Sequence, residues 1–134
     1  MSPSPHSWRM SRVRSTGNKS TEAVFVSLLR TARISGWRRH LDLLGRPDFT
    51  FRTERLVVFI DGCFWHGCRR CKKIPHANEK FWSQKMAYNR QRASAVNRGL
   101  RSQGWVVYRV WEHELKYPAP IVEHLQSLLN HRQD

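Results

Sequence analysis

The segment VVFIDGCFWHGCRRC, residues 57–71, constrains the fold of this chain more than any other. Its first residues are apolar and either β-branched or aromatic, which is typical of a buried β-strand. The apolar run ends at Asp61-Gly62, and all three cysteines of the chain follow between Cys63 and Cys71. The fold must therefore bury a strand and organise a polar, cysteine-rich loop directly after it.

The other segments predict helices and strands around this strand. Residues 18–34 have apolar side chains at helical spacing, and residues 37–47 form a short bridge. Two extended segments, 48–51 and 55–60, predict a hairpin, followed by a long helix over 79–103, a strand over 105–111 and a closing helix over 119–132. This order predicts an α/β sandwich, with one central mixed sheet flanked by helices.

The chain is strongly basic. It has 134 residues, with 24 lysines and arginines against 10 acids, a net charge of +14 and a pI near 11.0. The length suits one domain, which we place at residues 18–134 after a basic arm at 1–17. A domain with this charge is typical of nucleic-acid binding, although architectural and ribosomal proteins share it. The chain has no run of 18 apolar residues and no apolar leader, so we expect a soluble intracellular protein.

The three clustered cysteines predict a metal site. Their number is odd and their spacing is short, which favours zinc over a disulfide framework, with free cysteines as the alternative. A tetrahedral zinc ion needs a fourth ligand, and His66, His76 and His113 are the candidates that spacing leaves open. His113 follows a strand that we expect beside the one ending at Ile60. A site closed by four protein ligands stabilises structure and leaves the chemistry to other residues.

A second site is predicted from two acids. Asp48 begins the first hairpin segment and Asp61 ends the second, so pairing would bring the two carboxylates into a common space. Carboxylates with a nearby backbone carbonyl suit Mg²⁺, and His66 is a base that titrates near neutrality. This combination on a basic protein predicts phosphodiester hydrolysis. The alternative is that Asp61-Gly62 is an ordinary turn and Asp48 a loop acid.

The adjacent Phe64 and Trp65 are unusual in a tight polar loop. Their functional interpretation is a wedge that inserts between base steps of DNA, and the alternative is that one ring packs beneath the loop. The long helix has an inward stripe at 82, 86, 89, 93, 96 and 100 that is interrupted by one polar residue, Asn89.

Four segments in order, GRPDF, VVFIDGCFWHGC, FWSQKMAYNRQR and GWVVYRVWEHE, resemble the very short patch repair (Vsr) DNA mismatch endonucleases. The resemblance covers roughly residues 10–114. It implies a fold related to the PD-(D/E)xK restriction nucleases and a cytoplasmic bacterial enzyme that nicks DNA 5′ to the thymine of a T:G mismatch. It also implies catalytic Mg²⁺ and structural Zn²⁺.

The resemblance assigns roles to particular residues. Asp48 and the carbonyl of Ile60 hold Mg²⁺, His66 is the base, Asp61 stands at a second active-site position, and Glu22 is an acid near the site. The zinc set is Cys63, Cys68, Cys71 and His113. The DNA contacts are Met10, Phe64, Trp65, Asn89 and Arg92.

One position departs from the family pattern. The family usually has an aspartate that orients the histidine base, and this chain has Ala93 there. Ala93 is compatible with a slowed enzyme, a compensating acid or a chain kept for binding. The alternatives to a mismatch endonuclease are a zinc-stabilised module that binds distorted duplex without cutting it, and a Vsr-like nickase with a different target. We expect a monomer that acts on double-stranded DNA, with mismatch-repair accessory proteins as further candidate partners.

Overall fold

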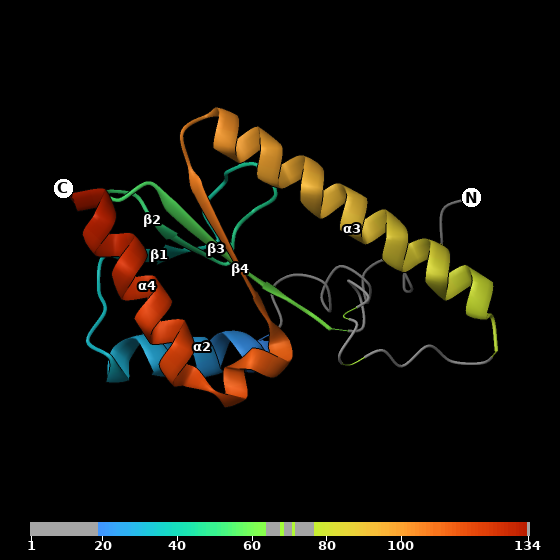
Figure 1. The fold of residues 1–134 in the computed structure, drawn as a ribbon, viewed down its shortest axis with the longest axis horizontal. Helices are drawn as coiled ribbons and strands as arrows, with labels where there is room; N and C mark the ends of the chain where they lie inside the picture. Colours follow the sequence, from blue (N-terminus) through green and yellow to red (C-terminus); the bar gives the residue numbers. More distant parts are fainter. Residues whose placement is uncertain (1–18, 64–67, 69–70, 72–76, 134) are drawn as a thin grey trace.

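The computed structural model describes residues 19–63, 68, 71 and 77–133 (Figure 1). Its elements are, in order, α2 (Lys19–Thr31), β1 (Trp37–Arg39), β2 (Phe49–Phe51), β3 (Leu56–Asp61), α3 (Glu79–Ser102), β4 (Val106–Trp111), the 3₁₀ helix η1 (Glu112–Lys116) and α4 (Pro118–Gln133). The predicted α/β class with a central mixed sheet is confirmed.

The sheet has the strand order β1-β2-β3-β4. The first three strands pair antiparallel, which confirms the predicted hairpin of β2 and β3. β4 pairs parallel to β3, in a register that runs from Leu56 beside Val106 to Asp61 beside Trp111. The long helix α3 is the crossover that a parallel connection requires.

Strand β1 lies within residues 37–47, where the sequence predicts a bridge, so this expectation is wrong for residues 37–39. The strand is only three residues long, and two of them are exposed arginines, so no alternating pattern marks it. It exists because Trp37 and Arg39 pair with Phe51 and Phe49 of β2, a contact that sequence periodicity does not report.

Helices cover both faces of the sheet. Figure 1 shows α2 and α4 on one side and α3 on the other. Every residue of β3 is buried, as expected for a strand enclosed on both faces. The core beneath α2 and α4 contains Phe25, Leu29, Phe49, Phe51, Val58, Ile60, Val110, Ile121 and Leu125. A smaller core beneath α3 contains Val57, Phe59 and Leu100.

Helix α2 buries an acid together with its apolar stripe. Phe25, Leu28 and Leu29 lie on the inner face, as their spacing predicts. Glu22 is one turn before Phe25 and therefore points in the same direction, and it is only 1% exposed. The helix thus directs a carboxylate toward the sheet.

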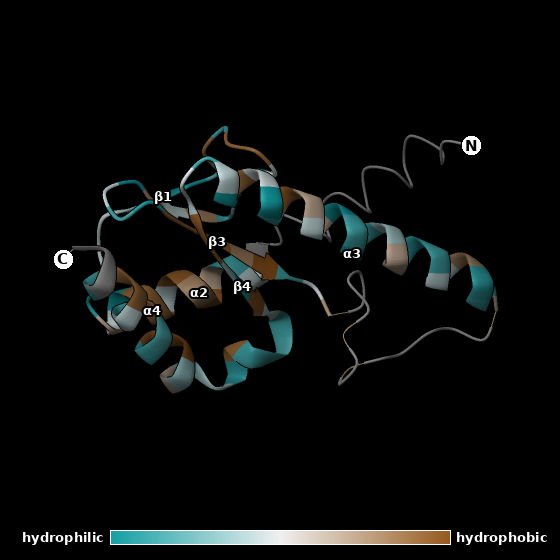
Figure 2. Cartoon of the chain, turned by 45° about the horizontal axis from the view of Figure 1, so that its top comes forward, coloured by the Kyte–Doolittle hydropathy of each residue, from teal (hydrophilic) through white to brown (hydrophobic). Residues whose placement is uncertain are grey.

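Helix α3 follows the predicted stripe. Met86 and Leu100 are buried, and the stripe positions between them are half-buried. The opposite face is polar, with hydrophilic residues recurring along the helix in Figure 2. In Figure 1 the N-terminal part of α3 extends past the sheet. No described helix is long and apolar enough to cross a membrane.

The loop before β2 packs closely on α3. Gly45 has a φ of +76°, and a Cβ placed there would lie 2.5 Å from Cγ1 of Val96. Leu44 packs against Gly99 of the same helix. These contacts fix the loop that leads to Asp48.

We predict that Gly45→Ala destabilises the protein by about 2–4 kcal/mol, because left-handed strain adds to overpacking against Val96. The matched control is Gly36→Ala. Gly36 has a φ of +87° but nothing within 4 Å of the added Cβ. The substitution Gly36→Ala should therefore lower the free energy of unfolding by only about 1 kcal/mol. Urea denaturation measures both, and equal losses would show that the contact with Val96 is unimportant.

Candidate active site and metal centre

Three of the predicted site residues, Asp61, Cys63 and His113, lie at the edge of the sheet where β3 and β4 end. Asp61 and Trp111 are paired as the last residues of the two parallel strands. The cysteine segment leaves β3 at this edge, and η1 leaves β4 beside it. Segments fifty residues apart in sequence, such as those of Cys63 and His113, are therefore neighbours.

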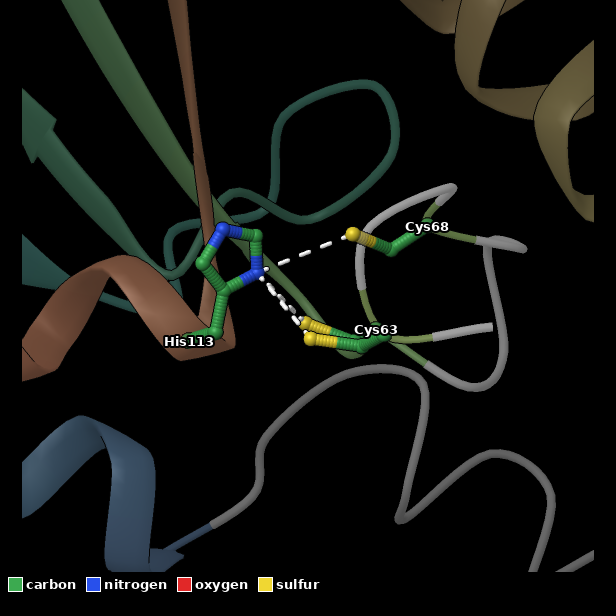
Figure 3. Close-up of side chains that lie close together, drawn as sticks. Cys63, Cys68 and His113 are labelled. Carbon is green, nitrogen blue, oxygen red and sulfur yellow. Dashed lines mark hydrogen bonds between the residues drawn. The ribbon is translucent and has the colours of Figure 1, made fainter. Parts of the chain in front are cut away.

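The three cysteine sulfurs surround one ring nitrogen of His113. The Nδ1 atom lies 3.2 Å from Sγ of Cys63, 3.6 Å from Sγ of Cys68 and 3.4 Å from Sγ of Cys71. Figure 3 shows the side chains of Cys63 and Cys68 directed toward this nitrogen. The four donors form one compact group that could hold a metal ion.

The spacing of these donors fits zinc. Tetrahedral Zn²⁺ with ordinary bond lengths separates sulfur and nitrogen ligands by about 3.6 Å, close to the distances found here. Burial, together with the neighbouring Cys71 and Cys68, raises the pKa of the Cys63 thiol to about 12. A bound cation would stabilise the thiolate in this buried setting. Of the histidines considered for the fourth ligand, His66 and His76 lie outside the described residues.

A second cluster lies where the loop before β2 meets α2. One ligand atom each from Glu22, His40 and Asp48 lies within 4.8 Å of the others. Asp48 is 3% exposed, and its Oδ2 accepts a hydrogen bond of 2.7 Å from the backbone N–H of Ile60. This bond ties the carboxylate to the end of β3.

The same hydrogen bond indicates the direction of the Ile60 carbonyl. In a β-strand the N–H and C=O groups of one residue point toward the same neighbouring strand. Since the N–H of Ile60 points to Asp48, its carbonyl points to the same side. A carboxylate and a carbonyl oxygen are donors that Mg²⁺ accepts, so the residues present fit the predicted ion.

The carboxylate of Glu22 contacts two basic side chains. Its Oε1 accepts hydrogen bonds of 2.7 Å from Nη2 of Arg39 and from Nε2 of His40. Its Oε2 is buried and has no hydrogen-bond partner in the described part of the chain. The predicted proximity of Glu22 to Asp48 therefore comes with a histidine and an arginine that the sequence did not single out.

Asp61 pairs with a basic residue of β4. Its Oδ1 lies 2.8 Å from Nη1 of Arg109, on the face of the sheet that α3 covers. Successive side chains of a strand alternate between faces, so Asp61 lies with Val57 and Phe59, and Ile60 lies with the opposite core. The expectation that Asp48 and Asp61 face one common space stays a prediction.

Arg109 connects Asp61 to the helix. Its Nε donates to Oδ1 of Asn97 at 2.7 Å, its Nη2 lies 3.4 Å from the carbonyl oxygen of Ala93, and its guanidinium lies 4.1 Å from the Phe59 ring centre. At Ala93, the position that departs from the family pattern, the chain contributes this carbonyl. A charged residue inside the apolar strand 106–111 was the signal that could have identified Arg109.

The remaining predicted residues divide into two groups. Asn89 is half-buried and Arg92 is exposed on α3. Met10, Phe64, Trp65 and His66 lie outside the described residues. His40 was missed because it follows an unrecognised three-residue strand, and no motif in the sequence marks it.

Comparisons with known proteins agree with the resemblance. Residues 1–73 match the family model described as DNA mismatch endonuclease Vsr. The type II nicking enzyme V.XorIIP of Xanthomonas oryzae pv. oryzae is 36% identical over 97% of this chain and 96% of its own length. The type II nicking enzyme V.NaeI of Lentzea aerocolonigenes is 39% identical over 75% of this chain, but the match spans only 63% of V.NaeI. The DNA mismatch endonuclease Vsr of Escherichia coli K12 is 34% identical over 78% of this chain and 68% of its own length.

We predict that removing the metal from the cysteine cluster unfolds or strongly destabilises the protein, because the four donors tie two separate segments together. Cys63→Ser should lower the melting temperature in the same way, by about 10 °C or more if ~2–4 kcal/mol is lost. Metal analysis and thermal denaturation with and without a chelator measure the effect. An unchanged melting curve in metal-free protein would contradict a structural role.

We predict that Arg109→Leu costs about 3 kcal/mol, because it leaves the buried carboxylate of Asp61 without its cation. Adding Asp61→Asn to Arg109→Leu should restore part of this loss, since the uncompensated charge is removed. Urea denaturation of the wild type, both single variants and the double variant completes the cycle. Strictly additive losses would show that the pair is not coupled.

Proposed function

Because the chain belongs to the Vsr family of DNA mismatch endonucleases, we propose that it nicks duplex DNA 5′ to the thymine of a T:G mismatch, with Asp48 at the reacting phosphate. The chain is a DNA endonuclease, and enzymes of this class hydrolyse phosphodiester bonds. The observation that carries the assignment to Asp48 is its buried carboxylate, held by the Ile60 N–H and grouped with Glu22.

Asp48 and the carbonyl of Ile60 would hold Mg²⁺. When bound, this ion supplies Lewis-acid polarisation of the scissile phosphate. The N–H of Ile60 restrains the Asp48 side chain, so the carboxylate does not need to be ordered when substrate arrives. Glu22 adds negative charge beside this position, which favours binding of a cation.

His66 is proposed as the base that takes a proton from the attacking water. It lies between Cys63 and Cys68 in the sequence, and both of these residues reach the His113 nitrogen. Zinc held by the cysteine cluster would therefore restrict the short segment that carries His66, Phe64 and Trp65. The role of Phe64 and Trp65, together with Met10, is to contact the DNA beside the mismatch.

Helix α3 is the proposed surface for the DNA backbone. It has a single acidic residue, Glu79, and most of its basic side chains are exposed. Asn89 faces inward on this helix, and Arg92 faces outward where it can pair with phosphate. The basic residues of α3 are Lys80, Lys85, Arg90, Arg92, Arg98 and Arg101.

The composition supports the same partner. A net charge of +14 on 134 residues gives a strong, salt-dependent attraction to the phosphate backbone. We propose that residues 1–17 form an arm that adds to this contact and that 18–134 are the endonuclease domain. A cytoplasmic monomer that acts on chromosomal DNA, assisted by mismatch-repair proteins, is the proposed setting.

The names of two relatives support a DNA target other than the T:G mismatch. V.XorIIP and V.NaeI are named as type II nicking enzymes, and the chain matches nearly the whole of V.XorIIP. The alternative function is therefore a Vsr-like nickase for a different target. Ala93 supports a further alternative, a module that binds without cutting, because the base would lack an orienting carboxylate.

We predict that Asp48→Asn lowers Mg²⁺-dependent nicking of a T:G duplex by about a thousandfold, equivalent to ~4 kcal/mol of transition-state stabilisation. Asparagine can still accept from the Ile60 N–H, so the loop should keep its structure and DNA binding should change little. Asp42→Asn, at an exposed acid of the same loop, is the matched control and should nick normally.

The assay uses supercoiled and oligonucleotide duplexes that carry T:G, T:A or other mismatches, with Mg²⁺ or EDTA. Nicking by Asp48→Asn near the wild-type rate would refute the metal role of Asp48. Tight binding of the wild type with no product on any duplex would favour the binding module. Nicking of matched DNA or of other mismatches in preference to T:G would favour the different target.

A further inference from the structure

Glu22 is incompletely satisfied in its buried position. Its Oε1 accepts from Arg39 and His40, whereas Oε2 has no hydrogen-bond partner among the residues that the structure describes. A buried polar atom without a partner is destabilising, and more so when it is charged. Such an atom indicates a missing water or ion. The side chains around Glu22 are therefore suited to an additional positive ligand.

His40 is held beside this carboxylate by its backbone. Its φ of +53° lies in the left-handed region, which is unfavourable for a non-glycine residue. Its N–H donates to the backbone carbonyl of Asp48 at 3.4 Å. The strained backbone at residue 40 is thus attached to the residue that carries the proposed metal-binding carboxylate, and the imidazole turns toward Glu22.

We propose that His40 is a third protein ligand of the metal ion at Asp48, acting through Nε2 together with Glu22. This inference rests on the proposed function of Asp48. One ligand atom from each of the three residues lies within 4.8 Å of the others. Ligands of one octahedral ion with bonds of about 2.1 Å are about 3–4 Å apart, so a movement of about 1 Å completes the set.

The position of His40 permits this movement. Its side chain is 48% exposed, whereas that of Glu22 is 2% exposed, so the imidazole can adjust against a fixed acid. When an ion binds, the Nε2 proton that faces Glu22 is released to solvent, and the imidazole keeps a proton on Nδ1 and presents the Nε2 lone pair to the ion. Arg39 keeps its own hydrogen bond to Glu22 and has no lone pair to offer.

A nitrogen ligand changes which ions the site prefers. Carboxylate and carbonyl oxygens suit Mg²⁺ and Mn²⁺, whereas imidazole increases affinity for later transition ions such as Co²⁺ and Ni²⁺. The site is therefore a mixed nitrogen and oxygen site that takes borderline divalent ions more tightly than a site of oxygens alone. The affinity of the site for Mg²⁺ increases little when His40 is a ligand.

The test uses the full-length, zinc-loaded protein and the variant His40→Asn. Asparagine tolerates the left-handed backbone and can still donate to Glu22, so it removes the nitrogen ligand and keeps the positioning contact. We expect His40→Asn to weaken Co²⁺ binding, measured by calorimetry, about tenfold or more and to change Mg²⁺ binding less than about threefold. Arg39→Gln is the matched control, because it alters the other hydrogen bond to Glu22.

Pulsed electron paramagnetic resonance of bound Mn²⁺ gives a direct second measurement. The wild type should show coupling to a coordinated imidazole nitrogen, lost in His40→Asn and retained in Arg39→Gln and His66→Asn. Coupling that persists in His40→Asn, or is absent from Mn²⁺-loaded wild type, would overturn the inference. A wild type that shows this coupling but nicks no duplex would count against the proposed function and leave the ligand assignment standing.

Discussion

The parallel pairing of β3 with β4 is the interaction on which the rest of the structure depends. It aligns Asp61 with Trp111, so both strands end at one edge of the sheet. The cysteine segment and η1 leave from that edge, which brings Cys63 within 3.2 Å of His113. Burial of β3 on both faces stabilises this pairing, because helices cover each side of the strand. Without that register the four donors of the cluster would belong to unconnected segments.

Two kinds of polar group lie near the end of β3. In the first, Asp48 is tied to the backbone of Ile60 and grouped with Glu22 of α2. In the second, Asp61 is paired with Arg109 beneath α3. Within the described residues, the first group contains a buried carboxylate oxygen, Oε2 of Glu22, that has no hydrogen-bond partner, whereas the second group contains an acid paired with a cation. This difference supports the proposal that the reacting ion lies with Asp48.

The helices contribute in different ways to the two proposed activities of binding and cutting. Helix α2 places Glu22 inside the protein because the acid shares a face with Phe25. Helix α3 packs a narrow apolar stripe on the sheet and leaves basic residues on its outer face. The loop between β1 and β2 is fixed against α3 where Gly45 meets Val96. One sheet thus positions both the proposed metal-binding acid and the proposed phosphate-binding surface.

The sequence by itself determined the α/β class, the hairpin, the long helix and the proximity of Asp48 to the end of β3, since these follow from local periodicity and from the geometry of a hairpin. It also indicated that the cysteines gather, because they are close in the chain, and the family resemblance of its motifs named His113 as their fourth partner, which the cluster confirms. Only the tertiary structure decided the distances within that cluster, that Asp61 pairs with Arg109 and that His40 contacts Glu22. These contacts depend on strand register, on which face a side chain occupies and on a three-residue strand whose pairing partner lies elsewhere in the chain. None of these properties is encoded in a local pattern.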